Sequence, residues 1–216
     1  MDFERIRDFI ISFQDDADSF LNELRLKSEN EGVPIIRKDA EQWIRFLLKQ
    51  IKPERVLEIG MAVGYSAIVM AGELSKLGDA WHIDTCELEE SMIQRAGENM
   101  KAAGFDYGIT IHSGDASATL VGLTGKVYDF IFIDAAKAQY MDYLKKALKL
   151  SHPGTMIVTD NIFEDGKVLE SHFLVEKRDR TIHDRLKEYI HYITHTHELD
   201  TVLLPVGDGM ALSVVL

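Results

Sequence analysis

The sequence predicts an α/β protein in which a mostly parallel sheet carries helices on both faces. From Pro53 onward, short apolar runs alternate with amphipathic stretches of helical length, as in parallel strands joined by right-handed crossovers. The segment 206–209, VGDG, joins the last two runs tightly, so the sheet is expected to end in an antiparallel hairpin strand. The chain has 216 residues, 46% of them hydrophobic and 28% charged, which suits a single globular domain over 1–216.

The segment 1–52 is expected to be an N-terminal helical cap. Residues 2–31 have the pattern of two amphipathic helices, interrupted by Gly and Pro at 32–34, and a third helix is expected over about 37–51. The apolar face of the first helix consists of Ile6, Phe9, Ile10 and Phe13. The inward side chains of the third are expected to be Trp43, Phe46, Leu47 and Ile51.

Residues 53–216 are expected to form a Rossmann-like, doubly wound core with seven strands. The predicted strands are Arg55–Ile59, Ala80–Cys86, Ile109–His112, Tyr128–Ile133, Thr155–Thr159, Thr201–Pro205 and Met210–Val215. The predicted helices cover roughly 64–77, 89–103, 115–121, 138–149 and one long stretch of about 166–195.

Composition limits the class of function. With 24 Lys and Arg against 36 Asp and Glu, the net charge is -12, which gives no long-range attraction to phosphate and leaves nucleic-acid binding to local basic patches. The single cysteine, Cys86, excludes a disulfide framework and is interpreted as a small core residue. No apolar run is long enough to span a membrane, and the N-terminus is charged from Asp2, so a cytoplasmic location is expected.

Glycines and acids follow the predicted strands at the end where such sheets bind ligands. Gly60 and Gly64 let the backbone turn and approach a ligand, but their G-x-x-x-G spacing is not the dinucleotide fingerprint, which disfavours an NAD-dependent dehydrogenase. Glu58, beside this turn, suits an ammonium or sulfonium group. Glu87 follows the second strand and suits the two hydroxyls of a ribose, and Asp115 lies near an adenine-sized site.

Each of these residues also has a purely structural interpretation. The glycines can simply end a strand, Glu58 can cap a helix, and Asp115 is a good N-cap residue. The ordered set at successive strand ends is more specific than any member, and it resembles the S-adenosylmethionine site of class I methyltransferases.

A second group of polar residues follows the fourth and fifth strands. Asp134, Asp160 and Asn161 are expected to meet at the mouth of the sheet, where their oxygens suit Mg²⁺, Mn²⁺ or Ca²⁺. Lys137 lies one short turn after Asp134, close enough to serve as a general base on a substrate hydroxyl. The alternative is that both aspartates only cap helices. This explains one strand-end aspartate more readily than aspartates at the ends of two consecutive strands.

The motifs LEIGMAVGYSA, IFIDAAKAQY, VTDN and LPVGDGMALSV resemble the catechol-type, metal-dependent O-methyltransferases over residues 33–216. The resemblance implies a divalent cation held by Asp134, Asp160 and Asn161, with Lys137 as the base. It also implies contacts with S-adenosylmethionine from Asp134 and a set that matches the family's motifs: Glu58, Gly60, Gly64, Tyr65, Ser66, Glu87, Asp115 and Ala116. Homodimers are common in this family, so a homodimer is expected.

Within this family the chain is most similar to the bacterial tRNA 5-hydroxyuridine methyltransferases, on VPIIRKDA at 33–40, KRDRTIHDRLKEY at 177–189 and PVGDG at 205–209. This similarity implies methylation of the wobble uridine of the anticodon. Met61 and the pair Asp39-Ala40 depart from the family pattern, which leaves the substrate pocket open. The alternatives are a small catechol-type substrate, which chelates the cation in the same way, and a non-catalytic module that binds a nucleotide or adenosine.

Two basic clusters bear on the substrate. Positive residues gather at 37–52 and 177–187, although mixed-charge helices are usually just solvated surface. Aromatic side chains for base stacking are Phe163, Phe173 or Tyr192, each of which can equally be core. The histidines 191, 195 and 197 include an i, i+4 pair, but no third ligand is evident, which favours surface or packing roles.

Overall fold

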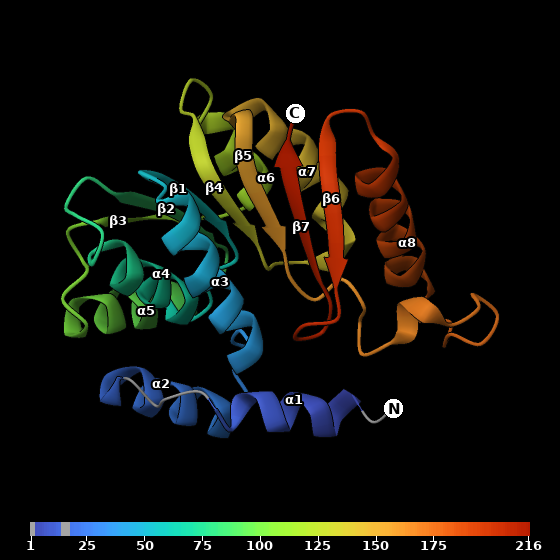
Figure 1. Ribbon diagram of the computed structural model, residues 1–216, viewed down its shortest axis with the longest axis horizontal. Coiled ribbons are helices and arrows are strands. Elements are labelled where there is room, and N and C mark those ends of the chain that lie inside the picture. The colour runs from blue at the N-terminus through green and yellow to red at the C-terminus, as the bar shows by residue number, and fades with distance from the viewer. Residues whose placement is uncertain (1–2, 14–17) are drawn as a thin grey trace.

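The computed structural model describes residues 3–13 and 18–216, so residue 2 and the stretch 14–17 of the predicted N-terminal helices lie outside the described residues. The centre is a seven-stranded sheet in the order β3-β2-β1-β4-β5-β7-β6, with β7 antiparallel to both of its neighbours (Figure 1). The strands are β1 Arg55–Ile59, β2 His82–Glu87, β3 Ile109–Ser113, β4 Tyr128–Ile133, β5 Ser151–Thr159, β6 Leu199–Leu204 and β7 Met210–Val215. This confirms the predicted α/β class and the antiparallel ending.

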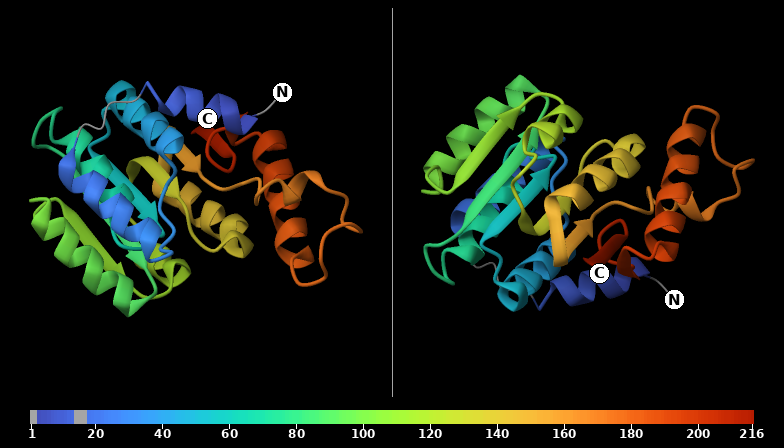
Figure 2. Two further views of the ribbon diagram at one scale, coloured as in Figure 1. Left: turned by 90° about the horizontal axis from the view of Figure 1, so that it is seen from below. Right: turned by 90° about the horizontal axis from the view of Figure 1, so that it is seen from above.

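Helices connect the strands and cover both faces of the sheet (Figure 2). They are α1 Phe3–Ile11, α2 Ser19–Asn30, α3 Lys38–Ile51, α4 Tyr65–Leu74, α5 Glu90–Ala102, α6 Ala116–Gly122, α7 Tyr140–Ala147 and α8 Arg180–His195, with short 3-10 turns η1 Lys137–Gln139, η2 Leu148–Leu150 and η3 Lys167–Leu169. The chain winds one way from β1 through β2 to β3 and the other way from β4 to β5. The crevice at this reversal, between β1 and β4, is where sheets of this kind bind ligands.

Two apolar cores flank the sheet because successive strand residues point to opposite faces. Val56 and Phe130 pack with α2 to α5, whereas their neighbours Leu57 and Ile131 pack with α6 to α8. All four are fully buried. Strands buried on both faces are continuously apolar, as β4 is in its run FIFI, and this is the pattern that made the parallel strands recognisable.

The N-terminal helices lie across the end of the sheet where the parallel strands finish (Figure 1). Helix α2 is packed, with Leu21 and Leu24 buried in the core shared with α3 and α4. Helix α1 is not: Phe9 is 65% and Ile10 52% exposed. None of the described helices is long and apolar enough to cross a membrane.

Two sequence predictions are wrong. The helix predicted over 166–195 is broken: α8 begins only at Arg180, and 170–179 is an irregular segment. Phe173 is 84% and Leu174 75% exposed, and Val175 is the one apolar side chain of this segment that is buried, so little core contact offsets the cost of ordering a helix there. In α3, Trp43 and Phe46 do not point inward but are 36% and 54% exposed. The buried face of α3 is one position further round and comprises Ala40, Ile44, Leu47 and Leu48.

Candidate functional site

The loop after β1 comes against the loop after β4 at Gly60. Ile59 pairs with Ile133 in the sheet, so Gly60 and Asp134 emerge side by side. A Cβ on Gly60 would lie 2.0 Å from the carbonyl oxygen of Asp134, and its φ is +95°. Only glycine fits such a contact. The close approach joins the two loops into one wall.

Glu58 lies beneath this wall rather than on it. Its carboxylate is fully buried and accepts hydrogen bonds from Ser66 Oγ and Thr85 Oγ1, both at 2.5 Å. Burial raises the pKa of Glu58 to about 7, against the lowering effect of these two hydroxyls. The side chain therefore holds Ser66 in place, and the direct ligand contact expected from the sequence is not available to its fully buried carboxylate.

Glu87 ties together the loops that follow β1 and β2. One carboxylate oxygen accepts from the amides of Met61 and Ala62, the latter at 2.8 Å, and the other accepts from Leu88 and Glu89 at 2.8 and 2.9 Å. Ribose hydroxyls would have to share this carboxylate with the backbone amides. Glu87 thus lies where the sequence predicted a ribose-binding carboxylate, and it also holds the loops after β1 and β2 together.

A cavity of about 560 Å³ lies between these loops at the carboxyl ends of β1 to β4. Its lining includes most of the residues predicted from the sequence: Gly60, Tyr65, Ser66, Glu87, Asp115, Ala116, Asp134, Lys137 and Asn161. Gly64 instead occupies the N-cap position of α4, with a φ of +82°. Asp115 serves both interpretations, because it lines the cavity and also caps α6 by accepting from the Ala118 amide at 2.9 Å.

The three predicted cation ligands come together. The side-chain Nδ2 of Asn161 donates to Asp134 Oδ1 at 2.8 Å, and its backbone N–H donates to Asp160 Oδ1, also at 2.8 Å. Asn161 reaches both because its backbone is left-handed, with a φ of 59°. Asp160 is only 2% exposed. The carboxyl ends of β4 and β5 thus hold two carboxylates and an amide in one cluster.

The electrostatics of this cluster fit a cation. Burial, with the nearby Asp134 charge, raises the pKa of Asp160 to about 8, and burial raises the pKa of Asp134 as well. Asp39 adds a further buried carboxylate whose Oδ1 has no hydrogen-bond partner within the described part of the chain. Crowded, desolvated carboxylates are stabilised by a hard divalent ion, and the oxygen donors are of the type that Mg²⁺ prefers.

Lys137 lies in the cavity wall but is not alone there. Its Nζ forms an ion pair with Glu164 and lies 3.8 Å from Asp208 Oδ2. Glu164 follows β5 in a tight, left-handed turn with a φ of 51°, and Asp208 lies in the β6–β7 hairpin. Two acids thus flank the Lys137 side chain in the cavity. This pairing was missed from the sequence, where VGDG indicated only a turn.

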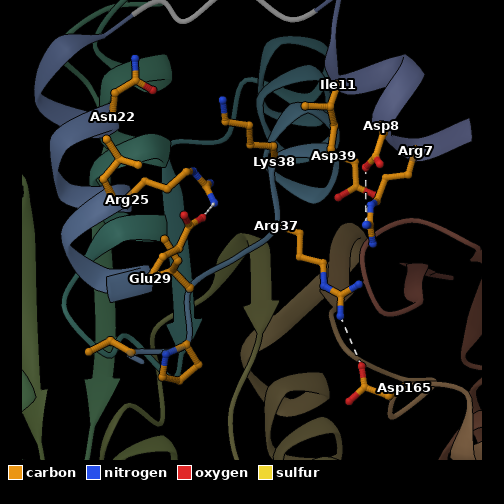
Figure 3. A pocket seen from close by; sticks show the side chains of 14 residues that line it. Arg7, Asp8, Ile11, Asn22, Arg25, Glu29, Arg37, Lys38, Asp39 and Asp165 are labelled. Atoms are coloured by element: carbon orange, nitrogen blue, oxygen red, sulfur yellow. Dashed lines mark hydrogen bonds and ion pairs between the residues drawn. The ribbon is translucent and has the colours of Figure 1, made fainter. Parts of the chain in front are cut away.

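A second cavity of about 960 Å³ opens beside the first, under α1 and α2 (Figure 3). Both cavities include Arg37 and Asp165, which pair across the boundary at 3.3 Å. The second cavity has a lining of mixed charge, with four cationic and four acidic side chains: Arg7, Arg25, Arg37, Lys38, Asp8, Glu29, Asp39 and Asp165.

Arg25 links the N-terminal segment to the first cavity. It donates to Glu41 Oε2 at 2.9 Å and to the Tyr65 hydroxyl at 3.2 Å, while Tyr65 donates to the same Glu41 oxygen at 2.8 Å. All three are buried. The sequence placed Tyr65 in the cofactor site but offered no sign that Arg25 and Glu41, far away in the chain, hold its hydroxyl.

Cys86 agrees with its interpretation as a core residue. It is 1% exposed, and burial raises the pKa of its thiol to about 12, which keeps it protonated.

Comparison with known proteins identifies the family. A model of the O-methyltransferase family matches residues 11–215. The chain belongs to the O-methyltransferase family. It is 34% identical over 194 residues to a catechol O-methyltransferase from Niastella koreensis, covering 85% of this chain and 84% of that protein. It is 30% identical over 184 residues to caffeoyl-CoA O-methyltransferase 2 from Populus trichocarpa, covering 81% and 72%.

A solved structure supports the same assignment. The SAH-bound methyltransferase PaMTH1 from Podospora anserina superposes with a TM-score of 0.86 at 25% identity, over 99% of this chain and 94% of that one. The predicted fold and the predicted enzyme class, an O-methyltransferase, are both confirmed.

Proposed function

We propose that this O-methyltransferase transfers the methyl group of S-adenosylmethionine to a substrate hydroxyl beside a divalent cation, and that its substrate is 5-hydroxyuridine at the wobble position of tRNA. The observation that carries the reaction is the meeting of two sets of residues in one cavity. Glu87 and Asp115 lie at the ends of β2 and β3, and Asp134, Lys137 and Asn161 lie at the ends of β4 and β5. A methyl donor and an acceptor hydroxyl can therefore share one space.

The cofactor is assigned from the wall of the first cavity. Glu87 would accept the ribose hydroxyls, and Asp115 with the Ala116 amide would face the adenine. Gly60 leaves the backbone open to the methionine part, next to Ser66. The SAH-bound Podospora methyltransferase with this fold supports the assignment.

Asp134, Asp160 and Asn161 would hold the cation, for which Mg²⁺ is the first choice and Mn²⁺ or Ca²⁺ the alternatives. When bound, the cation lowers the pKa of a coordinated hydroxyl and fixes its position. Lys137 in its neutral amine form takes the hydroxyl proton, and the resulting oxygen nucleophile attacks the sulfonium methyl in line while S-adenosylhomocysteine leaves. Because Lys137 is ion-paired with Glu164 here, its ammonium has to give up a proton to solvent, and the pair has to separate, before it can act as a base.

The second cavity supports an anionic substrate larger than a catechol. Arg37 stands where the two cavities join, and beyond it the lining carries Arg7 and Lys38 together with the acids Asp8, Glu29 and Asp39. Within this mixed lining, the side chains of Arg7, Arg37 and Lys38 are the groups that RNA phosphates would contact. Of the three aromatic residues considered for base stacking, Phe173 is 84% exposed and fits that role best.

The basic clusters contribute unequally. In the cluster 177–187, Arg185 donates to the carbonyl of Ala138 and Lys187 to that of Glu170, so these cations serve the fold. In the cluster 37–52, Arg45 is turned toward Glu41 and Glu73. The RNA proposal therefore rests on the cations of the second cavity.

The alternative is a small catechol-type substrate. The Niastella relative is a catechol O-methyltransferase, and a catechol chelates a cation through two adjacent oxygens just as 5-hydroxyuridine does through its hydroxyl and 4-carbonyl. A non-catalytic nucleotide-binding module is disfavoured by the presence of Lys137 beside the carboxylates. The cytoplasmic location and the homodimer expected from the sequence stay predictions.

Methyl transfer from labelled S-adenosylmethionine tests the proposal. The purified protein is given tRNA that carries 5-hydroxyuridine or a simple catechol, each with Mg²⁺ and with a chelator. We expect chelator-sensitive labelling of the tRNA at a kcat/KM well above that for the catechol. Labelling of the catechol alone would replace the RNA proposal with the small-molecule alternative. Labelling of neither substrate would favour the non-catalytic binding module. Labelling that survives the chelator would overturn the proposal that a divalent cation takes part.

A further inference from the structure

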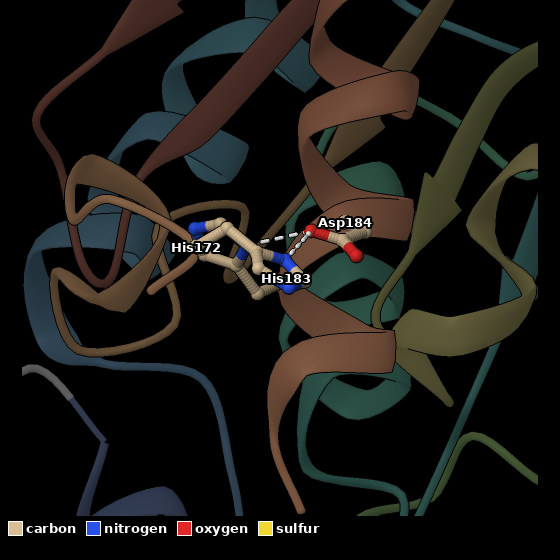
Figure 4. A group of neighbouring side chains, drawn as sticks. All are labelled: His172, His183 and Asp184. Atoms are coloured by element: carbon tan, nitrogen blue, oxygen red, sulfur yellow. Dashed lines mark hydrogen bonds and ion pairs between the residues drawn. The ribbon is translucent and has the colours of Figure 1, made fainter. Parts of the chain in front are cut away.

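A second cluster of metal-ligating side chains lies away from the cavities, where the irregular segment 170–179 meets the start of α8 (Figure 4). His172 Nδ1 lies 2.8 Å from Asp184 Oδ1, and His183 Nδ1 lies 3.0 Å from the same oxygen. One ligand atom from each of the three residues falls within 4.8 Å of the others. Within the described part of the chain, no other group of three or more His, Cys, Asp or Glu residues was found with ligand atoms this close together.

The buried imidazole of His183 is held in one orientation between Glu170 and Asp184. His183 is 1% exposed, and its Nε2 lies 3.1 Å from the carbonyl oxygen of Glu170. A carbonyl only accepts, so Nε2 must carry the hydrogen. Nδ1 of a neutral ring then presents a lone pair to the Asp184 carboxylate, which is also a lone-pair donor. Two lone-pair donors thus face one another at 3.0 Å, and a metal ion placed beside them could be bound by both.

We propose that His172, His183 and Asp184 bind one transition-metal ion of the Zn²⁺ type, and that this ion fastens the segment 170–179 to α8. Two imidazoles and a carboxylate are ligands of Zn²⁺, with water completing a tetrahedron. Ligand distances of about 2.0–2.1 Å place neighbouring donor atoms roughly 3.3 Å apart, a few tenths of an ångström beyond those observed. The ring nitrogen of His183 opposite the ion is held by a backbone carbonyl, as it is in most zinc-bound histidines.

The site is open on one side and closed on the other. The side chains of His172 and Asp184 are 42% and 53% exposed, whereas that of His183 is 1% exposed. An ion can therefore enter from solvent and meet a buried, oriented ligand. Because His172 belongs to the irregular segment and the other two ligands lie near the start of α8, the bound ion would restrain a segment in which Phe173 and Leu174 face solvent and Val175 is the buried apolar side chain.

This site is chemically different from the cluster at Asp134. Imidazole nitrogen prefers Zn²⁺ and its neighbours in the transition series, whereas the carboxylate and amide oxygens at the active site prefer Mg²⁺. No step of the proposed methyl transfer uses His172, His183 or Asp184. The zinc proposal therefore stands or falls separately from the proposed function.

The first experiment is a zinc titration of the protein without an affinity tag, in competition with a chromogenic zinc chelator and in excess Mg²⁺. We expect one tight equivalent per chain, and at least about a tenfold loss of affinity in His172→Ala, because one of three protein ligands is removed. His172 is largely on the surface, so this variant should fold. The matched control is His195→Ala, since His195 is an exposed member of the stacked pair with His191 on the same helix.

A second variant separates the two cation sites. Asp160→Ala removes a carboxylate from the active-site cluster and should leave the tight zinc equivalent in place. Loss of zinc binding in Asp160→Ala or in His195→Ala, with none in His172→Ala, would overturn the proposal. So would the absence of a tight equivalent in the unaltered protein.

Limited proteolysis with trypsin measures the consequence for the chain. Lys177 and Arg178 are exposed in the segment that the ion would fasten. We expect Zn²⁺ to slow cleavage there several-fold in the unaltered protein and not in His172→Ala. Equal protection of both proteins would show that zinc acts elsewhere.

Discussion

The carboxyl ends of β1 to β5 and the segment 162–179, which reaches the first cavity through Asp165, are held in different ways. At the strand ends, each functional residue follows directly from the register of a buried strand: Gly60 comes after the pair Ile59 and Ile133, and Asp160 follows Thr159. The segment 162–179 has no strand frame and is held by separate contacts, such as the burial of Ile162 and Val168 and the ion pair of Lys167 with Asp179. Substitutions at the strand ends should therefore strongly reduce activity or stability, whereas substitutions in the segment 162–179 should have smaller effects.

A change to the active-site carboxylates or base should have the largest effect. Asp160→Ala and Lys137→Ala should each lower kcat by about 100-fold or more, because a cation or base of this kind supplies several kcal/mol to the transition state. Binding of S-adenosylmethionine should survive in both, measured by calorimetry. Asp200→Ala, an exposed acid on β6, is the control and should turn over normally. Retained methylation in Asp160→Ala or Lys137→Ala would contradict the site assignment.

Gly60→Ala should damage the strand-end frame itself. The new Cβ would lie 2.0 Å from a backbone oxygen at a φ of +95°, and neither can move easily. We expect a loss of about 2–4 kcal/mol in the free energy of unfolding, measured in urea. Gly97→Ala in α5 is the matched control, since a Cβ there meets nothing within 4 Å. That variant should gain roughly 0.5–1 kcal/mol, and equal effects of the two would contradict the close contact.

The acidic cluster should make stabilisation by Mg²⁺ depend on pH. Aspartate ionises near pH 4 in an unfolded chain, but burial raises the pKa of folded Asp160 to about 8. The folded protein thus holds the extra proton between these values, and without a cation its stability falls as the pH rises through that window. The gain in Tm from Mg²⁺ should therefore widen from about pH 5 to pH 8. Asp160→Asn should flatten this trend, and a gain independent of pH in the unaltered protein would argue against cation binding here.

Arg37→Ala should have the smallest effect and should act on one substrate class. Arg37 is partly exposed and pairs with Asp165 at 3.3 Å where the cavities join. Loss of one phosphate contact should raise KM for tRNA and reduce the slope of its salt dependence by about 1, with little change for a catechol. Lys49→Ala, whose cation pairs with Glu73 instead, is the control. The same change in KM for both substrates would show that Arg37 acts on the fold of the site.

Where strands dominate, the sequence predicted the structure well. The continuous apolar runs and the polar residue after each one located Glu87, Asp134, Asp160 and Asn161 at one end of the sheet, and the structure brings them there. Glu58 was the exception. It lies one residue before the strand ends and points into the interior between Ser66 and Thr85, where side-chain direction, not position in the chain, decides its contact.

The remaining errors come from contacts between distant segments. In 170–179 the apolar residues are the consecutive Phe173, Leu174 and Val175, and Val175 alone of these is buried, so too little packing is available to form a helix there. The pairing of Lys137 with Glu164 depends on a left-handed turn after β5, and that of Tyr65 with Arg25 joins residues 40 positions apart. Pattern and propensity carry no information on such pairs.

The buried contact of Arg25, Glu41 and Tyr65 sets a limit on how far the chain can be shortened. A protein that begins at Asp18 keeps α2 and with it the guanidinium that holds the Tyr65 hydroxyl. One that begins at Gly32 loses Arg25, leaves Glu41 with Arg45, and frees the Tyr65 hydroxyl in the wall of the first cavity. Removal of α1 thus takes away only the outer side of the second cavity, whereas removal of α2 also disturbs the cavity proposed to bind the methyl donor.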